Sequence, residues 1–491
     1  MRVFHINKTA GKWLISFFII SFLQFIFSNI IIEKVGMDAE QIEKWMSIYE
    51  WLILLNSVLC LISIRSIYKS FLTPYTIFLI FLLLFNVGQF IMWALGIHYI
   101  TPLSKELGIS THIRYLDNLT LLKVMGISLP AISFFHLGYL ITNIQSANQK
   151  FKTQDTRLVK YLFFRIGIIL LVFSSLFVMY QSIHNLSVSM RTGYTSLYYG
   201  NESEIGNPIV KYISYMFIPS IFLIFIGSNY SKKVFKSLTI VFLCYLIINL
   251  LSGDRGSWIY FICIWLFCYI KLYGFKRDKL KILIKFGILG LLILFSTSVF
   301  VAFREIGFGN ITKEDIFLVL KNSQMVFIKP IFEMGQSARV LGILVQDNIN
   351  RLWEYGNTYL YGFISAPLPR IKVLFGFPDY YLDDWLSQVY LGLKNYGVGF
   401  SLFAEAFLNG GFLLYPFYVF LIGILIGKVS NQDINVDHPI KEFICLAGIT
   451  ILLPLCRGSF ELNMRKFFYG CIVLVGIIYL FKYLAKVRDS S

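Results

Sequence analysis

Three short stretches of this chain combine ionisable side chains with glycines inside an otherwise apolar sequence. The first, Ser252–Gly256, joins two apolar runs. Its two glycines relax the backbone, so that Arg255 can point back between the flanking segments. A guanidinium presents paired N–H donors that match the oxygens of a phosphate or diphosphate. Alternatively, Asp254 and Arg255 pair with each other in a hydrated turn.

The second stretch, Gly397–Gly411, places Glu405 in the middle of apolar residues. If this stretch lies at membrane depth, an ionisable group there is costly and is expected to face a polar cavity or a cationic partner. We consider its carboxylate a candidate proton acceptor. The alternative is that Glu405 caps a helix or pairs with a structural arginine.

The third stretch lies near the end of the chain, where Arg457, Glu461 and Arg465 are spaced four residues apart. On a helix this spacing would align them on one face. A surface ion pair explains Glu461 with Arg465. Arg457 lies just beyond Pro454 and is therefore the better candidate for binding an anion.

Four further ionisable residues between positions 304 and 396 could approach a substrate, namely Arg304, Glu333, Arg339 and Arg370. Glu333 and Arg339 are six residues apart, about 240° around a regular helix, so they do not form a simple same-face pair. Each of the four could instead be merely solvated.

The elements that must position these residues are membrane-spanning helices. The 491 residues are 57% hydrophobic, and apolar runs of about 20 residues, enough to cross roughly 30 Å of hydrocarbon as helix, recur along the whole chain. The class is therefore an all-α, polytopic helical membrane protein. Twelve spans are predicted, near residues 13–32, 46–64, 74–96, 119–141, 161–180, 212–228, 238–251, 257–272, 283–303, 401–427, 442–455 and 467–485.

Basic residues follow a positional pattern that predicts the orientation of the chain. They gather in alternate inter-span segments, which places those segments on the cytoplasmic side. Both termini are then cytoplasmic, with the first span retained as an anchor. Because the basic residues are scattered in this way, the net charge of +17 does not indicate nucleic-acid binding. The partner that the charge pattern implies is the lipid bilayer.

The spacing of the spans divides the chain into three parts: nine spans in residues 1–303, one large outer loop in 304–396, and three spans in 397–491. The loop contains aromatic residues and is not disordered by composition. Thr312 and Asp315 predict the start of a helix that reaches Lys329, and Pro330 permits a second helix through about Val345. Residues 366–369 predict a rigid turn. We expect the loop to form a partly helical cap on the outer membrane surface.

Neither a metal nor another cofactor is predicted. The seven cysteines lie in or beside apolar runs without paired metal-ligand spacing, and they are typical of small core residues. His136 also lies in an apolar run and is expected to make a core hydrogen bond.

The layout of a dozen spans with one large outer loop resembles the Wzy-type O-antigen or capsular oligosaccharide repeat-unit polymerases. The resemblance rests on Leu250–Trp258, Gly397–Gly411, Leu453–Ser459, and Tyr355–Leu360 followed by Pro367 and Pro369. The resemblance covers most of the chain in its layout of spans and loops, but it rests on few individual residues.

The resemblance implies a place in the bacterial inner membrane and glycosyl transfer at its periplasmic face between polyprenyl-diphosphate-linked oligosaccharides. Undecaprenyl diphosphate would leave, and neither a nucleotide sugar nor a metal would be needed. A chain-length regulator is a possible partner. Cationic groups would stabilise the diphosphate and a carboxylate would accept the proton of the attacking hydroxyl. The candidates for the first role are Arg255, Arg304, Arg339 and Arg457, and those for the second are Glu333, Glu405 and Asp254.

Two other functions remain open. A lipid-linked oligosaccharide flippase would also have about a dozen spans, but such transporters usually have short loops and charges within both halves of the bundle. An O-antigen ligase would share the donor and the mechanism and differ only in its acceptor.

Overall fold

The computed structural model describes residues 8–34, 38–98, 115–146, 156–192, 208–252, 257–273, 312–314, 329–349, 357–368, 371–376, 380–393, 397–431 and 438–490. The described part of the chain is helical throughout and contains no strand. Ten of its helical segments are long and apolar enough to cross a membrane, and Trp258–Tyr273 is a shorter apolar helix. These eleven match eleven of the twelve predicted spans. The predicted span at 283–303 lies outside the described residues.

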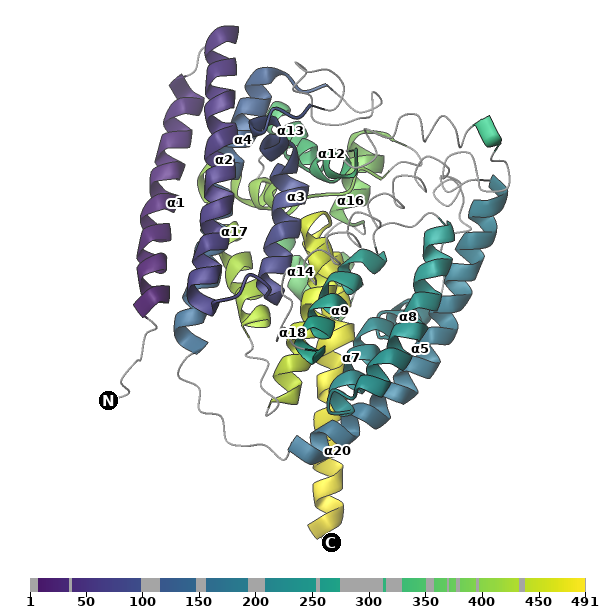
Figure 1. Ribbon diagram of the computed structural model, residues 1–491. Coiled ribbons are helices and arrows are strands. Elements are labelled where there is room, and N and C mark those ends of the chain that lie inside the picture. The colour runs from purple at the N-terminus through teal and green to yellow at the C-terminus, as the bar shows by residue number, and fades with distance from the viewer. Residues whose placement is uncertain are drawn as a thin grey trace.

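The first group of helices stands on the left of Figure 1. It consists of α1 (Lys8–Lys34), α2 (Ala39–Tyr68), α3 (Pro74–Ala94), α4 (Asn118–Ser146) and α17 (Leu402–Ser430). Helix α3 begins at a sequence-encoded cap, where the Thr73 hydroxyl accepts the Thr76 amide and Pro74 takes the first turn.

The second group lies to the right and below. It contains α5 (Thr156–Thr192), α6 (Pro208–Ser214), α7 (Phe217–Gly227), α8 (Lys232–Ser252), α9 (Ser257–Tyr273) and α18 (Pro439–Leu452). The last segment runs on from the 3-10 turn η6 (Leu453–Cys456) through α19 (Phe460–Phe467), the π-helical turn η7 (Phe468–Ile472) and α20 (Val473–Ser490).

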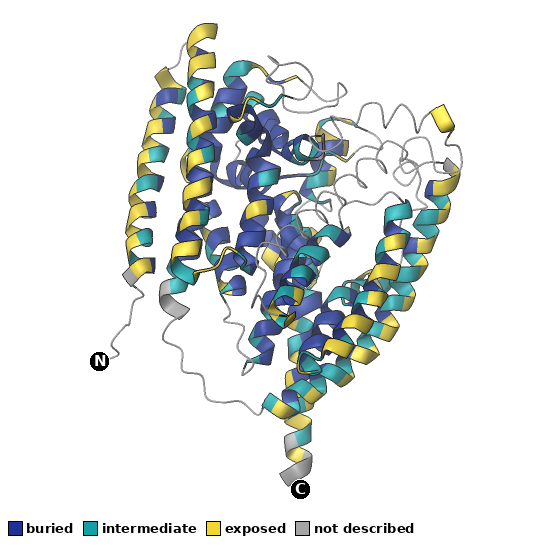
Figure 2. Cartoon of the chain, in the orientation of Figure 1, coloured by how far each residue is buried: buried dark blue, intermediate teal, exposed yellow. Residues whose placement is uncertain are grey.

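Burial follows the pattern of a membrane bundle. Helices α3 and α4 are buried almost all round, whereas α1, α2, α5 and α8 carry exposed outer faces (Figure 2). Those outer faces are apolar, as on α5, where Val172, Phe173 and Leu176 are 55 to 65% exposed. Large apolar side chains turned outward indicate that the surroundings are hydrocarbon.

The start of α1 and the end of α20 lie at the same end of the bundle, the lower end in Figure 1. An even number of crossings requires this arrangement. The basic residues Lys12, Arg65, Lys160 and Lys428 all lie near helix ends on that lower side. That this side is the cytoplasmic one stays a prediction from the charge pattern.

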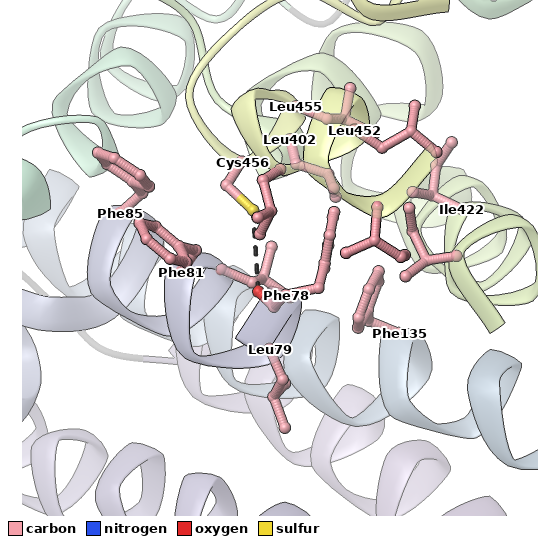
Figure 3. Packing of buried hydrophobic residues seen from close by; sticks show 14 of the residues in the cluster. Phe78, Leu79, Phe81, Phe85, Phe135, Leu402, Ile422, Leu452, Leu455 and Cys456 are labelled. Atoms are coloured by element: carbon pink, nitrogen blue, oxygen red, sulfur yellow. Dashed lines mark hydrogen bonds between the residues drawn. The ribbon is translucent and has the colours of Figure 1, made fainter. Parts of the chain in front are cut away.

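The two groups meet around α3, α4, the start of α17 and η6. There the rings of Phe78 and Phe135 stack 5.6 Å apart, with Leu402, Leu455 and Cys456 packed above them (Figure 3). This apolar centre fixes where α17 begins and where α18 ends.

Helices α4 and α17 approach each other through glycines. A Cβ on Gly423 would lie 2.1 Å from the carbonyl oxygen of Phe135, and one on Gly138 would lie 2.2 Å from that of Phe420. Without a hydrophobic effect between helices in lipid, such close backbone contact is a main source of helix association. Helix α17 also bends at Gly411, whose φ of 54° and ψ of −160° interrupt the helix. The half-helix that carries Glu405 therefore has its own direction.

The described helices of the large loop pack among the spans, which differs from the expected surface cap. The segment predicted as one helix from Pro330 is split into α12 (Lys329–Gly335) and α13 (Ala338–Gln346). Gly335, the last residue of α12, packs closely against Gln89 of α3, which also donates a 2.6 Å hydrogen bond to the Phe332 carbonyl.

The other loop elements are α14 (Thr358–Ser365), α15 (Ile371–Leu374), α16 (Leu382–Asp384) and the π-helical turn η5 (Trp385–Tyr390). Of these, α14 packs against α19. The predicted turn follows α14 directly. The predicted helix from Thr312 is described only over its first residues, of which Lys313 and Glu314 are helical.

Replacing Gly423 by alanine should destabilise the protein by about 1–3 kcal/mol, because the added methyl group overlaps the α4 backbone. The matched control is Gly476→Ala in α20, where nothing lies within 4 Å of where a Cβ would stand. That control should leave stability equal or slightly higher. Unfolding in detergent micelles checks both variants, and equal midpoints would contradict the close packing of α4 on α17.

Candidate functional site

The second and third of the stretches singled out above meet at one place, together with the start of α14 in the large loop. The Phe400 amide donates a 2.9 Å hydrogen bond to the Arg457 carbonyl, which joins the second stretch to the third. Gly399 makes this approach possible, since its φ of +73° suits glycine and its α-carbon faces Arg457. The loop segment enters through Thr358, which contacts Glu405 and Asn409. Residues nearly a hundred positions apart thus form one polar centre.

Glu405 is the hub of this centre. One carboxylate oxygen accepts the Thr358 hydroxyl at 2.7 Å and the other accepts the Phe460 amide at 2.8 Å. The Asn409 amide completes the set by donating to the Thr358 hydroxyl oxygen at 2.7 Å. Phe460 is the first residue of α19, and the helix has no side-chain cap of its own. A carboxylate at that position satisfies a free amide and complements the helix dipole.

The geometry of Glu405 therefore supports the capping role that the sequence left open. The side chain is 1% exposed and both of its oxygens are occupied. In this conformation it holds α14, α17 and α19 together and presents no free oxygen to a substrate.

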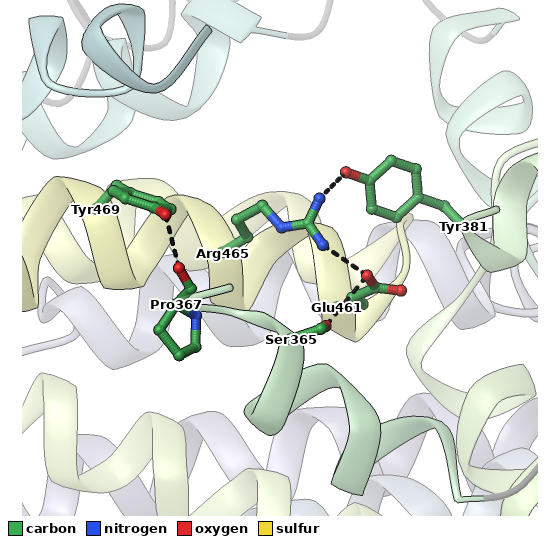
Figure 4. Close-up of polar contacts among 6 residues, drawn as sticks. All are labelled: Ser365, Pro367, Tyr381, Glu461, Arg465 and Tyr469. Carbon is green, nitrogen blue, oxygen red and sulfur yellow. Dashed lines mark hydrogen bonds and ion pairs between the residues drawn. The ribbon is translucent and has the colours of Figure 1, made fainter. Parts of the chain in front are cut away.

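A second buried centre lies one turn further along α19 (Figure 4). Arg465 donates from one terminal nitrogen to Glu461 at 2.7 Å and from the other to the Tyr381 hydroxyl. Ser365 donates to the same Glu461 oxygen at 3.2 Å. The pair Glu461 with Arg465 is confirmed, but it is buried and not on the surface, with side chains 4% and 7% exposed. It ties the end of α14 and the residue before α16 to the last span.

Arg457 does not share the helical face of that pair, because α19 starts only at Phe460. It lies in the turn after η6 and is exposed. Its guanidinium lies over the ring of Phe85, 5.9 Å from the centroid. Within the described ranges no carboxylate lies at ion-pair distance from it. An exposed arginine held by a ring and not by an acid can still bind an anion.

Helix α3 brings Glu333 towards the same region. The Phe85 ring lies under the Arg457 guanidinium, and Gln89 donates to the α12 carbonyl that precedes Glu333. Phe85 and Gln89 are four residues apart on α3 and therefore share one face of that helix. Arg339 is 6% exposed on α13, which packs against α4 and α17. The predicted site residues Asp254, Arg255 and Arg304, and also Arg370, lie outside the described residues.

Two residues of this region were missed or misjudged from the sequence. Asp383 is placed beside the Arg457 turn, because a Cβ on Gly458 would lie 3.9 Å from its carboxylate. Burial raises the pKa of Asp383, and the hydroxyl and amide of Ser459 offset only part of the increase. A carboxylate with a raised pKa beside a cationic turn is a candidate general base. The two adjacent aspartates within Tyr381–Trp385 were the sequence feature that could have identified this carboxylate. Arg465 was dismissed as a surface residue.

The predicted core role of His136 is confirmed. The ring is fully buried and contacts the hydroxyls of Ser63 at 2.6 Å and Tyr75 at 2.9 Å. Over the described ranges, no group of three or more His, Cys, Asp or Glu side chains is arranged to hold a metal ion.

The fold and the site define a class of protein: a polytopic helical membrane protein in which arginines and carboxylates gather in one region of the bundle. The family model for the O-antigen polysaccharide polymerase Wzy matches residues 13–488. The chain therefore belongs to this family of membrane glycosyltransferase-type polymerases, which act on lipid-linked oligosaccharides in polysaccharide biosynthesis. No curated protein and no solved structure matches the chain.

Substitutions of Glu405 separate capping from proton transfer. Glu405→Ala should lower stability by about 2–4 kcal/mol, because it leaves a buried hydroxyl and a helix-terminal amide without an acceptor. Glu405→Gln keeps one acceptor oxygen, so it should cost less and retain most polymer formation. Unfolding midpoints and product ladders measure the two effects. A Gln variant that is as stable as the wild type but inactive would instead identify Glu405 as the base.

Proposed function

We propose that this protein polymerises polyprenyl-diphosphate-linked oligosaccharide repeat units by glycosyl transfer at the periplasmic face of the inner membrane. The growing chain on its lipid diphosphate is the donor, and a lipid-linked repeat unit is the acceptor. The observation that carries the proposal is the family match over nearly the whole chain, together with an exposed Arg457 at the end of the bundle opposite the basic helix ends.

Arg457 has the properties that the leaving group requires. Cleavage of the anomeric bond builds negative charge on the diphosphate, and a fixed cation near it lowers the barrier by about 3 kcal/mol. The Phe85 ring and the Phe400 amide hold the turn that carries Arg457. Arg255, Arg304 and Arg339 remain proposed as further diphosphate ligands from other parts of the chain.

The attacking sugar hydroxyl needs a proton acceptor. Glu333 and Asp383 are the carboxylates near the Arg457 turn that support this role, the first through α3 and the second through Gly458. Asp254 remains a third candidate. Because the donor sugar already carries a lipid diphosphate as its leaving group and arginine would meet the developing charge, we propose that the reaction needs neither nucleotide sugar nor metal.

Arg457→Ala should reduce polymer formation by about 100- to 1,000-fold, because it removes a cation from the developing diphosphate charge. The assay uses purified protein in liposomes, lipid-linked repeat units, a metal chelator and no nucleotide sugar. The wild type should yield a ladder of longer oligosaccharides, and Arg457→Lys should be intermediate.

The matched control is Arg65→Ala. Arg65 is likewise exposed and lies 4.8 Å from the centroid of the Phe71 ring, but at the opposite end of the bundle. It should leave the ladder unchanged. A wild-type protein that moves the substrate between leaflets without elongating it would show that the function is transport, and equal ladders from both variants would remove Arg457 from the site.

A further inference from the structure

Helix α14 of the large loop turns a large apolar face outward. It buries Thr358 at 1% and Ser365 at 0% exposure, together with Gly362 and the rings of Tyr359 and Tyr361. The residues that it turns outward are large and apolar: Leu360, Phe363 and Ile364 are 60, 50 and 39% exposed. The apolar surface continues beyond the helix through Leu368, Val373, Leu374 and Phe375. Such a surface is unfavourable in water and suits hydrocarbon.

The contacts of α14 place it at the depth of the spanning helices. At its start, Asn357 donates a 2.7 Å hydrogen bond to the hydroxyl of Tyr418, which lies twelve residues, or about 18 Å, before the end of α17 at Ser430. Past its end, the Pro367 carbonyl accepts the hydroxyl of Tyr469, nine residues, or about 14 Å, into the last span. Figure 1 shows α14 at mid-height between α3 and α18.

The polar groups of this inserted segment are satisfied from inside the bundle. Thr358 and Ser365 donate to the buried carboxylates Glu405 and Glu461. Irregular backbone is tolerated at membrane depth only where the protein satisfies it in this way. The loop segment is therefore re-entrant, with its polar side bonded to the spans and the side chains of Leu360, Phe363 and Ile364 turned outward.

The apolar face begins beside the Arg457 turn. Phe363 packs edge-on against Phe460, with ring centroids 4.9 Å apart, and Phe460 follows Arg457 by three residues. A lipid whose diphosphate binds Arg457 would thus have its chain start next to Phe363.

We propose that the outward face of α14, formed by Leu360, Phe363 and Ile364, is the docking surface for the polyprenyl chain of the lipid-linked substrate. This inference rests on the proposed function, since the headgroup at Arg457 is what selects a polyprenyl chain over ordinary acyl chains. The re-entrant segment then fixes the lipid along the bundle while its headgroup reacts.

Photo-crosslinking tests the surface directly. Phe363→p-benzoylphenylalanine is introduced into the full chain, which is placed in phosphatidylethanolamine and phosphatidylglycerol liposomes containing undecaprenyl diphosphate. The matched control is Phe173→p-benzoylphenylalanine on α5, where the parent ring is 59% exposed on an outer face. Mass spectrometry of the adducts should show polyprenyl diphosphate enriched about tenfold or more over its mole fraction at position 363, and only bulk composition at position 173.

Adducts at position 363 that mirror the bulk lipids would mean that ordinary acyl chains cover the face, and no lipid adduct there would mean that α14 is not at membrane depth. Either result overturns the proposal. The polymerisation assay separates the two claims. A ladder without polyprenyl enrichment at position 363 would contradict only the docking surface. Enrichment without a ladder would support the docking surface and contradict the proposed reaction.

A second variant avoids dependence on the Phe363 ring packing. Leu360→Ala should raise the KM for an undecaprenyl-linked repeat unit about fivefold, because apolar contact with the chain is lost. Leu176→Ala on the outer face of α5, where the parent side chain is 65% exposed, should leave that KM unchanged. An equal change from both variants would indicate a general effect of apolar surface and contradict the docking role.

Discussion

The polar centre depends on one buried carboxylate. Glu405 receives the Thr358 hydroxyl from the large loop and the Phe460 amide from the last span, and it belongs to the half-helix of α17 before the Gly411 bend. A charge or a carboxylic acid without partners would be very costly at this depth. Its two hydrogen bonds therefore couple the position of the loop to the start of α19, because the same carboxylate holds both.

The rest of the site is arranged around that constraint. Because α19 must begin at Phe460, the chain before it turns outward and exposes Arg457 above Phe85. Because α14 must reach Glu405, its apolar face is carried to membrane depth beside the same turn. The glycine contacts between α4 and α17 supply the rigid frame, since they let the two backbones approach closely enough to fix the position of α17. The buried Glu461 and Arg465 pair adds a second attachment for the loop.

Much of the fold followed from the sequence, because apolar runs and basic helix ends are direct consequences of a bilayer. The length of the 304–396 segment was also visible, but the outward apolar face of α14 was not. Thr358–Ser365 is only eight residues long, and Leu360, Phe363 and Ile364 look like the buried face of a soluble helix until their exposure is known.

The site was predicted in parts. The stretches around Glu405 and Arg457 were identified by ionisable residues in apolar surroundings, and the structure brings them together. The amide partner of Glu405 could not be predicted, because every residue except proline has a backbone amide and the sequence does not show which one lies near the carboxylate. Asp383 and Arg465 could not be recognised for a related reason. Asp383 lies against Ser459, and Arg465 lies against Tyr381, and in both pairs the partners are far apart in the chain.

The most direct test of this account is the coupling free energy between Thr358 and Glu405, measured by reversible unfolding of Thr358→Val, Glu405→Gln and the double variant in mixed micelles. If the carboxylate holds the loop within the bundle, the two substitutions should be non-additive by about 1–3 kcal/mol. Additive effects would contradict the central claim, because the loop and the span would then be stabilised independently of each other.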